Sequence, residues 1–281
     1  MLRAVRLWFG AASVLAPGLA ERQAARVFLT PRRARTPRPP AVPAAGGQAF
    51  TLALEGFRLA GWSWGMGPAV LLIHGWSGSA ADMSALAGAV VRAGFRAVLF
   101  DMPAHGRSAG RQTTLVEWVR ALRAVERALG AVHAVVGHSF GAAAVTLALE
   151  DGLGARGAVL VAPPRDPGYF ASRIGRHIGL RAERVDGMLR RAVERVGREL
   201  SRVDASRAAR SLTVPALILH DPADREVPWE HARAIAEAWR GSRLVAREGA
   251  GHYRILSESA TLDAVTSFLA GLPRAAGPNV R

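Results

Sequence analysis

Short, continuous apolar runs recur along the chain from about residue 48 onward. They lie at residues 69–73, 97–100, 132–136, 158–161 and 216–219, with a last run at 243–246. Runs this short, without polar alternation, are typical of strands buried on both faces of a parallel sheet. Residues 50–56 and 57–64 precede them and predict a short meander.

Segments of helical spacing lie between these runs. They predict helices at residues 80–93, 114–129, 141–149 and 258–269. The alternation of strand and helix predicts an α/β fold, in which a mostly parallel sheet carries helices on both faces.

The alternation breaks once, between Pro163 and Leu212, where no buried strand run occurs. Apolar residues there fall on one face of a helix, at i, i+4, i+7 and i+11: Leu189, Val193, Val196 and Leu200. We therefore interpret residues 164–212, approximately, as a helical cap set into the α/β domain of residues 46–281.

The first 45 residues form a separate N-terminal segment. Arg3 and Arg6 precede an apolar run from Leu7 to Leu15, which is too short to span a bilayer. The run is compatible with a signal peptide cleaved near residues 18–20, or with a retained amphipathic helix that lies on a membrane or packs on the domain. Apolar positions continue at helical spacing beyond that point, which favours the retained helix: Ala20, Ala24, Val27 and Phe28.

A basic, proline-rich stretch follows at residues 31–40, and its composition is typical of a solvated linker. We expect a cytoplasmic protein whose N-terminal segment provides peripheral contact with a membrane. Export through a signal-like segment is the alternative.

Composition narrows the chemistry. The 281-residue chain has a net charge of +15, all its basic residues are arginine, and residues 1–45 carry +7 of that charge. The arginines are scattered and no recognition module is present, so we do not expect a nucleic-acid partner. The lack of cysteine excludes disulfides and thiolate chemistry, and the eight histidines lack metal-binding spacing. No phosphate-binding glycine loop or dinucleotide fingerprint occurs, so we expect no metal and no cofactor.

Gly137-His138-Ser139-Phe140-Gly141 follows the third buried run and opens a helix. A G-x-S-x-G turn in this context is a nucleophile elbow, which is sharp and strained and presents its serine at the carboxyl end of the sheet. Gly137 and Gly141 are small enough to permit such a turn. We therefore expect Ser139 to be a nucleophile and the Phe140 amide to point at a developing oxyanion.

A serine nucleophile needs a histidine base and an acid that orients it. Where such an elbow occurs, the order along the chain is serine, acid, histidine, so the candidate bases are His177, His220, His231 and His252. We favour His252, which lies in a glycine-rich loop after the last strand and can reach the sheet edge that carries Ser139.

Two candidate acids follow the apolar run at residues 216–219. Asp221 lies at the end of the strand, where it can cap the turn. Asp224 lies within the loop and is better placed to reach His252. We therefore favour Asp224 as the acid that holds the imidazole.

Further residues at this edge are candidates for binding the oxyanion or the substrate. His74-Gly75-Trp76-Ser77-Gly78 follows the first buried run, and the Trp76 amide is the expected second oxyanion donor. His74 supports that loop or lines the substrate site. The other candidates for the site lining are His138, Tyr169, Phe170 and Met188.

Together these motifs resemble those of the α/β-hydrolase superfamily, in particular small bacterial esterase- or lysophospholipase-like members with a helical cap. The matching segments are His74-Gly75, residues 101–108 (DMPAHGRS), the elbow at 137–141, residues 224–228 (DREVP) and Gly251-His252. The resemblance covers roughly residues 48–270. It implies a triad of Ser139, Asp224 and His252, with oxyanion amides at Trp76 and Phe140. Ala104 stands where the family often has glycine.

The expected reaction is hydrolysis of a carboxylic ester, or of a thioester, with an apolar acyl group, through an acyl-enzyme. Acyl transfer, cofactor-independent peroxidation and carbon–carbon bond hydrolysis use the same triad and stay open as alternatives. An epoxide hydrolase or dehalogenase is disfavoured because it needs a carboxylate where Ser139 stands. A non-catalytic binding protein is the alternative from another class, and the complete set of serine, acid and histidine argues against it.

Overall fold

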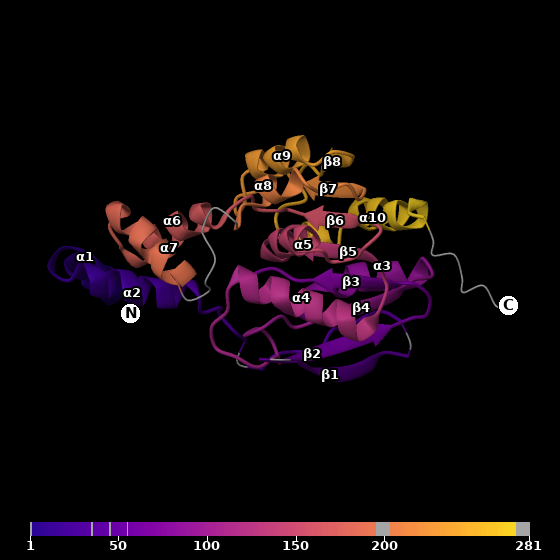
Figure 1. The fold of residues 1–281 in the computed structure, drawn as a ribbon, viewed down its shortest axis with the longest axis horizontal. Coiled ribbons are helices and arrows are strands. Elements are labelled where there is room, and N and C mark those ends of the chain that lie inside the picture. Colours follow the sequence, from indigo (N-terminus) through magenta and orange to yellow (C-terminus); the bar gives the residue numbers. More distant parts are fainter. Residues whose placement is uncertain (1, 35, 45, 55, 195–202, 274–281) are drawn as a thin grey trace.

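The apolar runs form one eight-stranded sheet (Figure 1). The computed structural model describes residues 2–34, 36–44, 46–54, 56–194 and 203–273. The strands are β1 (Gln48–Leu54), β2 (Phe57–Trp64), β3 (Ala69–Ile73), β4 (Arg96–Phe100), β5 (Val132–His138), β6 (Ala158–Val161), β7 (Ala216–His220) and β8 (Ser242–Ala246).

The sheet is mostly parallel, with the strand order β1-β2-β4-β3-β5-β6-β7-β8. β1 and β2 form an antiparallel hairpin and β2 runs antiparallel to β4, whereas all other neighbours are parallel. β3, β5, β6 and β7 are buried along their whole length, as strands covered on both faces must be. The α/β fold class expected from the sequence is confirmed.

Helices cover both faces of this sheet. They are α3 (Ser84–Arg92), α4 (Leu115–Leu129), α5 (Phe140–Glu150), α8 (Ala205–Ala209), α9 (Trp229–Ala238) and α10 (Ser259–Gly271), with short 3₁₀ turns η1 (Ala80–Met83), η2 (Ala182–Arg184) and η4 (Arg254–Leu256). One apolar core, which contains Phe100 and Trp118, lies beneath α4, α5, α8 and α9. A second core, which contains Met83 and Phe95, lies beneath α3 and α10. The two cores fix the sheet and therefore the loops at its edges.

Local signals set the ends of α4. Thr114 Oγ1 accepts the Glu117 amide at 3.2 Å, and the Glu117 carboxylate accepts the Thr114 amide at 2.8 Å. This reciprocal pair satisfies donors at the start of the helix that would otherwise lack partners. The helix ends at Gly130, whose φ of 78° suits glycine.

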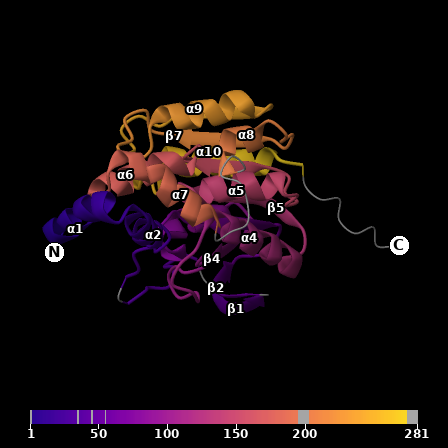
Figure 2. The same ribbon diagram turned by 60° about the vertical axis from the view of Figure 1, so that its left-hand side comes forward.

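Four further helices form a helical lobe at one end of the sheet (Figures 1 and 2). They are α1 (Leu2–Leu15), α2 (Pro17–Phe28), α6 (Pro167–Ile178) and α7 (Val185–Glu194). Their shared apolar core consists of Phe9, Ala12, Ala20, Ala24, Ala25, Leu29, Ala171, Ile178, Leu180, Met188, Leu189 and Ala192. The N-terminal segment and the inserted cap thus pack together, although they are far apart in the sequence. Val196 and Leu200, which the helical pattern of the cap included, lie outside the described residues.

Two glycines allow the N-terminal helices to approach the cap closely. A Cβ atom on Gly179 would lie 2.7 Å from the carbonyl oxygen of Arg6. One on Gly187 would lie 2.3 Å from the carboxyl carbon of Glu21. The Glu21 carboxylate in turn lies 3.2 Å from Nε of Arg191 on α7. A side chain at Gly179 would meet the backbone of α1, whereas one at Gly187 would displace the Glu21 carboxylate.

The stretch at residues 31–40 is largely exposed, and Arg33 attaches it to the domain. The Arg33 guanidinium donates hydrogen bonds to the carbonyl oxygens of Gly106 at 2.8 Å and Gly110 at 2.9 Å, and also to those of His105 and Ser108. The loop after β4 offers a cluster of carbonyl acceptors to which one guanidinium can donate together. Arg33 thereby ties the end of the N-terminal segment to that loop.

The helices of the N-terminal segment are short, with 14 residues in α1 and 12 in α2. Within the described ranges, no helix combines the length and the hydropathy that crossing a bilayer requires. Pro17 occupies the first position of α2 and so separates the two helices.

Candidate active site

Ser139 lies at the sharp turn between β5 and α5. Its φ of 51° and ψ of −122° fall in a region that residues other than glycine rarely occupy, so the turn is strained. A Cβ on Gly137 would lie 2.7 Å from the backbone of Ala142, and one on Gly141 would lie 2.4 Å from the His74 carbonyl oxygen. The turn therefore requires both glycines, as the elbow motif predicts.

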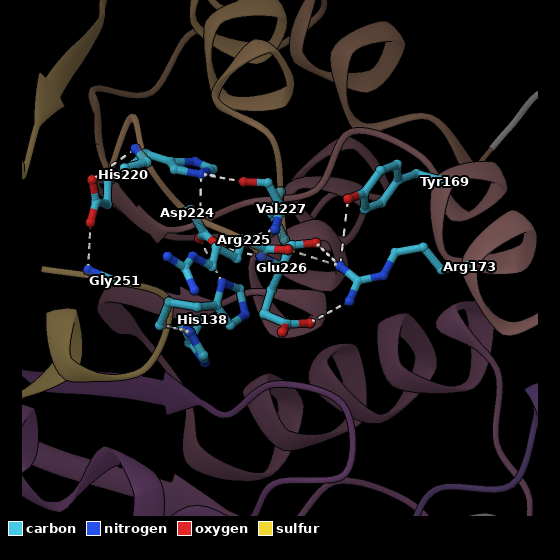
Figure 3. A network of polar contacts seen from close by, with 12 residues as sticks. His138, Tyr169, Arg173, His220, Asp224, Arg225, Glu226, Val227 and Gly251 are labelled. Carbon is cyan, nitrogen blue, oxygen red and sulfur yellow. Dashed lines mark hydrogen bonds and ion pairs between the residues drawn. The ribbon is translucent and has the colours of Figure 1, made fainter. Parts of the chain in front are cut away.

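A carboxylate and an imidazole meet beside this turn. His252 Nδ1 donates to Asp224 Oδ2 at 2.7 Å. The other carboxylate oxygen, Oδ1, accepts the amides of Glu226 at 2.7 Å and Val227 at 3.1 Å. Figure 3 shows Asp224 at the centre of this network. Because both oxygens are engaged, the carboxylate is fixed and can orient the His252 ring.

Asp224 favours its ionised form although its side chain is fully buried. Burial raises the pKa of Asp224, but the hydrogen bond and charge of His252, together with the amides of Val227 and Glu226, lower that pKa below its ordinary value. His220 adds a contact at 3.5 Å from Nε2 to Asp224 Oδ2. An ionised Asp224 can hold the Nδ1 proton of His252 and stabilise an imidazolium.

Asp221 has a different role from Asp224. Its Oδ2 accepts the Gly251 amide at 2.6 Å, and its Oδ1 accepts the Ala223 amide at 2.9 Å. Asp221 thus closes its own turn, as the sequence suggested, and also holds the residue before His252. The two acids place the histidine loop together, one through the backbone and the other through the ring.

His252 and Ser139 line the same cavity. Among the described residues, neither His252 Nε2 nor Ser139 Oγ has a hydrogen-bond partner, and the two atoms are not bonded to each other. Catalytic hydrogen bonds of this kind often shorten only when substrate binds. With Nδ1 occupied by Asp224, Nε2 is the ring nitrogen of His252 that is free to accept a proton.

His138 holds the backbone of His252 through a hydrogen bond. Its Nε2 donates to the His252 carbonyl oxygen at 2.9 Å, and the two ring centroids lie 4.8 Å apart. Burial and the nearby charge of His252 lower the pKa of His138 to about 3, so its ring stays neutral. His138 is therefore a positioning residue that does not face the substrate.

Two backbone amides at the elbow lack partners within the described part of the chain, those of Trp76 and Phe140. The Phe140 amide is the first of α5, where the helix N-terminus favours negative charge. Trp76 belongs to a loop that crosses directly over the elbow, because a Cβ on Gly75 would lie 3.2 Å from the Ser139 Cβ. Trp76 and Phe140 also pack together, with ring centroids 4.9 Å apart.

Buried histidines hold the Trp76 loop in place. His74 Nε2 accepts the Met102 amide at 3.0 Å, and its Nδ1 donates to the Gly75 carbonyl at 2.7 Å. His105 Nε2 accepts the Ser77 amide at 3.0 Å. Burial is the largest cause that lowers the pKa of His74 to about 3 and that of His105 to about 4, so both rings are neutral acceptors. The loops after β3 and β4 thereby brace each other.

The cavity that contains Ser139 has a volume of about 900 Å³. Its apolar wall comes from both halves of the helical lobe and includes Val27, Phe28, Phe170, Ile174 and Leu189. Arginines 6, 32, 173 and 176 also line it. The sequence did not assign Arg6, Val27 or Phe28 to this site. Helical spacing placed Val27 and Phe28 on one helix face but could not show which part of the molecule that face contacts.

His138, Tyr169 and Met188, which were expected to line the substrate site, lie outside the cavity lining, and so does His74, for which loop support was the other expected role. His74 and His138 are buried behind the loops, where hydrogen bonds to backbone groups occupy their rings. Met188 is fully buried in the core of the helical lobe. Tyr169 faces His231, at 5.1 Å between ring centroids. Phe170 does line the cavity, as expected.

Arg173 connects the helical lobe to the loop that carries Asp224 (Figure 3). Its guanidinium donates to the Glu226 carboxylate at 2.9 Å, to the Glu226 carbonyl at 2.7 Å and to the Arg225 carbonyl at 3.3 Å. The Tyr169 hydroxyl lies 3.5 Å from the same guanidinium. A residue on α6 thus holds the backbone whose amides bind Asp224.

The family model for alpha/beta hydrolases matches residues 70–265, a range that spans β3 to α10. The chain belongs to the alpha/beta hydrolase family. The matched range of this alpha/beta hydrolase contains the elbow and both loops that carry Asp224 and His252, whereas α1 and α2 lie outside it.

Solved structures of similar fold are known. An esterase of Pyrococcus furiosus has a TM-score of 0.68 and 19% identity, covering 87% of this chain and 98% of that chain. A putative lipase of Acinetobacter baumannii has a TM-score of 0.64 and 17% identity, covering 90% and 95%. An esterase of Exiguobacterium antarcticum has a TM-score of 0.60 and 17% identity, covering 76% and 96%. At these identities the likeness shows a common fold. No curated protein matches the chain.

Proposed function

We propose that this alpha/beta hydrolase is a serine hydrolase that cleaves a carboxylic ester, or a thioester, through an acyl-enzyme. The observation that carries the proposal is the 2.7 Å contact between Asp224 and His252, on the same cavity as the strained Ser139. An oriented imidazole beside a serine hydroxyl is what converts that hydroxyl into a nucleophile.

In the proposed mechanism, Ser139 Oγ attacks the carbonyl carbon while His252 Nε2 takes the hydroxyl proton. The amides of Trp76 and Phe140 bind the oxyanion of the tetrahedral intermediate, a type of contact whose loss costs about 3–4 kcal/mol. The intermediate collapses, and the departing alcohol or thiol takes its proton from His252. Water then attacks the acyl-enzyme and gives a proton to His252, which passes it to Ser139 Oγ as the bond to the acyl group breaks and the carboxylic acid is released.

The cavity favours an apolar acyl group. Its volume of about 900 Å³ lies at the upper end of the range for small-molecule sites, and side chains of α2, α6 and α7 supply the apolar wall. We therefore expect activity against p-nitrophenyl esters to rise with acyl length before it falls.

Labelling with a fluorophosphonate probe tests the nucleophile. Ser139→Ala should abolish labelling and lower ester hydrolysis by at least about 10⁴-fold, because no other group can form the acyl-enzyme. Ser77→Ala is the matched control, since Ser77 lines the same cavity and should leave labelling intact. Equal labelling of the wild type and Ser139→Ala would overturn the proposal.

A further inference from the structure

The outer face of α1 is apolar and exposed. Leu7, Trp8, Val14 and Leu15 are 75%, 44%, 58% and 83% exposed, and the alanines at positions 4 and 11 between them are exposed as well. These positions recur at the spacing of one helix face. We call this set, Ala4, Leu7, Trp8, Ala11, Val14 and Leu15, the outer face of α1.

The opposite side of the same helix is already occupied. Phe9, Ala12 and Ser13 are buried, and the first two belong to the core of the helical lobe. α1 is therefore apolar on two sides, of which packing within the chain needs only one. Single exposed apolar residues are common on protein surfaces, but a contiguous set on one helix indicates an interaction site.

Exposed basic side chains lie on α1 and on the neighbouring α2. Arg3, Arg6, Arg22 and Arg26 are all exposed. Glu21 is the one acid in α1 and α2, and its carboxylate is directed inward, 3.2 Å from Arg191 and 3.9 Å from Arg184. The surface around the outer face of α1 is thus positive without compensation from its own helices.

The charge distinguishes between the kinds of partner. A second copy of this chain on a two-fold axis would bring these arginines against their own equivalents. An anionic lipid surface, by contrast, attracts arginines and accepts apolar side chains beneath its headgroups. Trp8 is of the residue type enriched at such interfaces.

The location of the face agrees with a lipid partner. α1 lies at the outer edge of the helical lobe in both views of the molecule (Figures 1 and 2). Arg6 of α1 and Val27 of α2 line the cavity that holds Ser139. A lipid surface in contact with the outer face of α1 would therefore lie beside the helices that enclose the cavity.

We propose that the outer face of α1 docks on an anionic lipid bilayer. The helix lies in the plane of the interface, with Leu7, Val14 and Leu15 below the headgroups and the arginines among them. This contact goes beyond the proposed hydrolase activity and does not depend on it.

Co-sedimentation of the full chain with vesicles tests the proposal. The vesicles contain phosphatidylcholine alone or a mixture with phosphatidylglycerol. We expect binding to the mixed vesicles, weaker binding to the neutral ones, and loss of binding as salt screens the charges. In the double variant Leu7→Glu, Leu15→Glu, binding to mixed vesicles should fall about tenfold or more, because two apolar anchors become negative charges.

Met66→Glu is the matched control. Met66 is 85% exposed, but it lies in the turn between β2 and β3 and not in the helical lobe. This variant should bind vesicles like the wild type. The variants at positions 7, 15 and 66 should all retain wild-type circular dichroism, which shows that they fold.

Two kinds of result would overturn the proposal. One is wild-type binding by the variant with glutamate at positions 7 and 15, or no binding by the full chain to either vesicle. The other is a dimer in light scattering that this double variant converts to a monomer, which would assign the face to a second copy. Since vesicle binding is read without substrate, a failure of the hydrolase proposal would leave this test unaffected.

Discussion

The carboxyl edge of the sheet and the helical lobe are stabilised in different ways. At the sheet edge, buried polar side chains hold the loops through hydrogen bonds to backbone amides; these side chains are Asp101, Asp221, Asp224, His74 and His105. The lobe has an alanine-rich apolar core, and its ion pairs lie at the margin. Hydrogen bonds fix direction as well as distance, whereas apolar packing constrains mainly volume.

This difference suggests a division between chemistry and substrate selection. Reacting groups must be held to within about 0.5 Å, which the polar edge can provide. The wall of an acyl site has only to exclude water and set a length. We therefore expect substitutions at the edge to change the rate and substitutions in the lobe to change which substrate is used.

The largest effect is expected at Asp224. Asp224→Asn should lower kcat about 10⁴-fold, because an amide in place of the carboxylate favours the wrong tautomer of His252 and cannot stabilise its charge. Asp221→Asn is the comparison, since Asp221 holds the backbone of the same loop without touching the ring. Its main cost should be in stability, about 1–2 kcal/mol by urea unfolding. Equal losses of kcat in the two variants would contradict the assignment of the acid.

Acid should weaken the sheet edge before the lobe. The folded state keeps His74, His105 and His138 neutral, with pKa values of about 3, 4 and 3, whereas the unfolded chain protonates them near 6.5. The unfolded state then binds more protons, so the free energy of unfolding falls as pH falls. Between about pH 5.5 and 4.5 these three rings should together contribute about 4 kcal/mol per pH unit to the slope, about 1.4 from each.

Urea unfolding followed at successive pH values measures this slope. His105→Gln should reduce the slope by about 1.4 kcal/mol per pH unit, because one buried imidazole no longer titrates. A free energy of unfolding that stays constant from about pH 6.5 to 4.5 would show that the rings are not held neutral.

Filling the cavity should alter substrate length. Ile174→Trp on α6 and Val27→Trp on α2 each place a ring against the cavity. Both should lower kcat/KM for long p-nitrophenyl esters by about 10- to 100-fold and leave short ones nearly unchanged. If only the α6 variant shifts the length profile, the N-terminal helices do not form part of the acyl wall.

The smallest effect is expected at the contact between the lobe and the Asp224 loop. Arg173→Met removes the guanidinium from Glu226 and should lower kcat about two- to fivefold with little change in KM, since the partly exposed pair is screened by solvent. Arg233→Met provides the control, because Arg233 pairs with Glu237 on the exposed side of α9 at 3.5 Å. A decrease of equal size in both variants would exclude a positioning role for Arg173.

The sheet and the elbow could be predicted from the sequence because the patterns that indicate them are local. An unbroken apolar run predicts a strand buried on both faces, and the glycines that permit the elbow lie two residues to either side of Ser139. The pairing of Asp224 with His252 also followed, since two loops after neighbouring strands meet at one edge. The catalytic roles of these residues stay predictions.

The sequence could not predict which way the side chains point or how the helices of the lobe pack together. Spacing left His74 two roles, supporting its loop or lining the site, and could not show that its ring accepts the Met102 amide from a different loop. In the lobe, alanines and two glycines make the contacts, and such small residues give a weak periodic signal. The direction of the His74 ring and the packing of the lobe therefore both depend on contacts between residues that are distant in the sequence.

The packing of α1 and α2 on α6 and α7 imposes an order on assembly. The N-terminal helices are synthesised first, yet the helices that cover their inner side follow more than a hundred residues later. Contacts so distant in sequence form late, because the intervening chain has to be organised before its ends can meet. During translation, α1 therefore emerges with apolar residues on two faces, before the helices that cover one of those faces have been synthesised. Apolar surface exposed in this way favours aggregation until the lobe has formed.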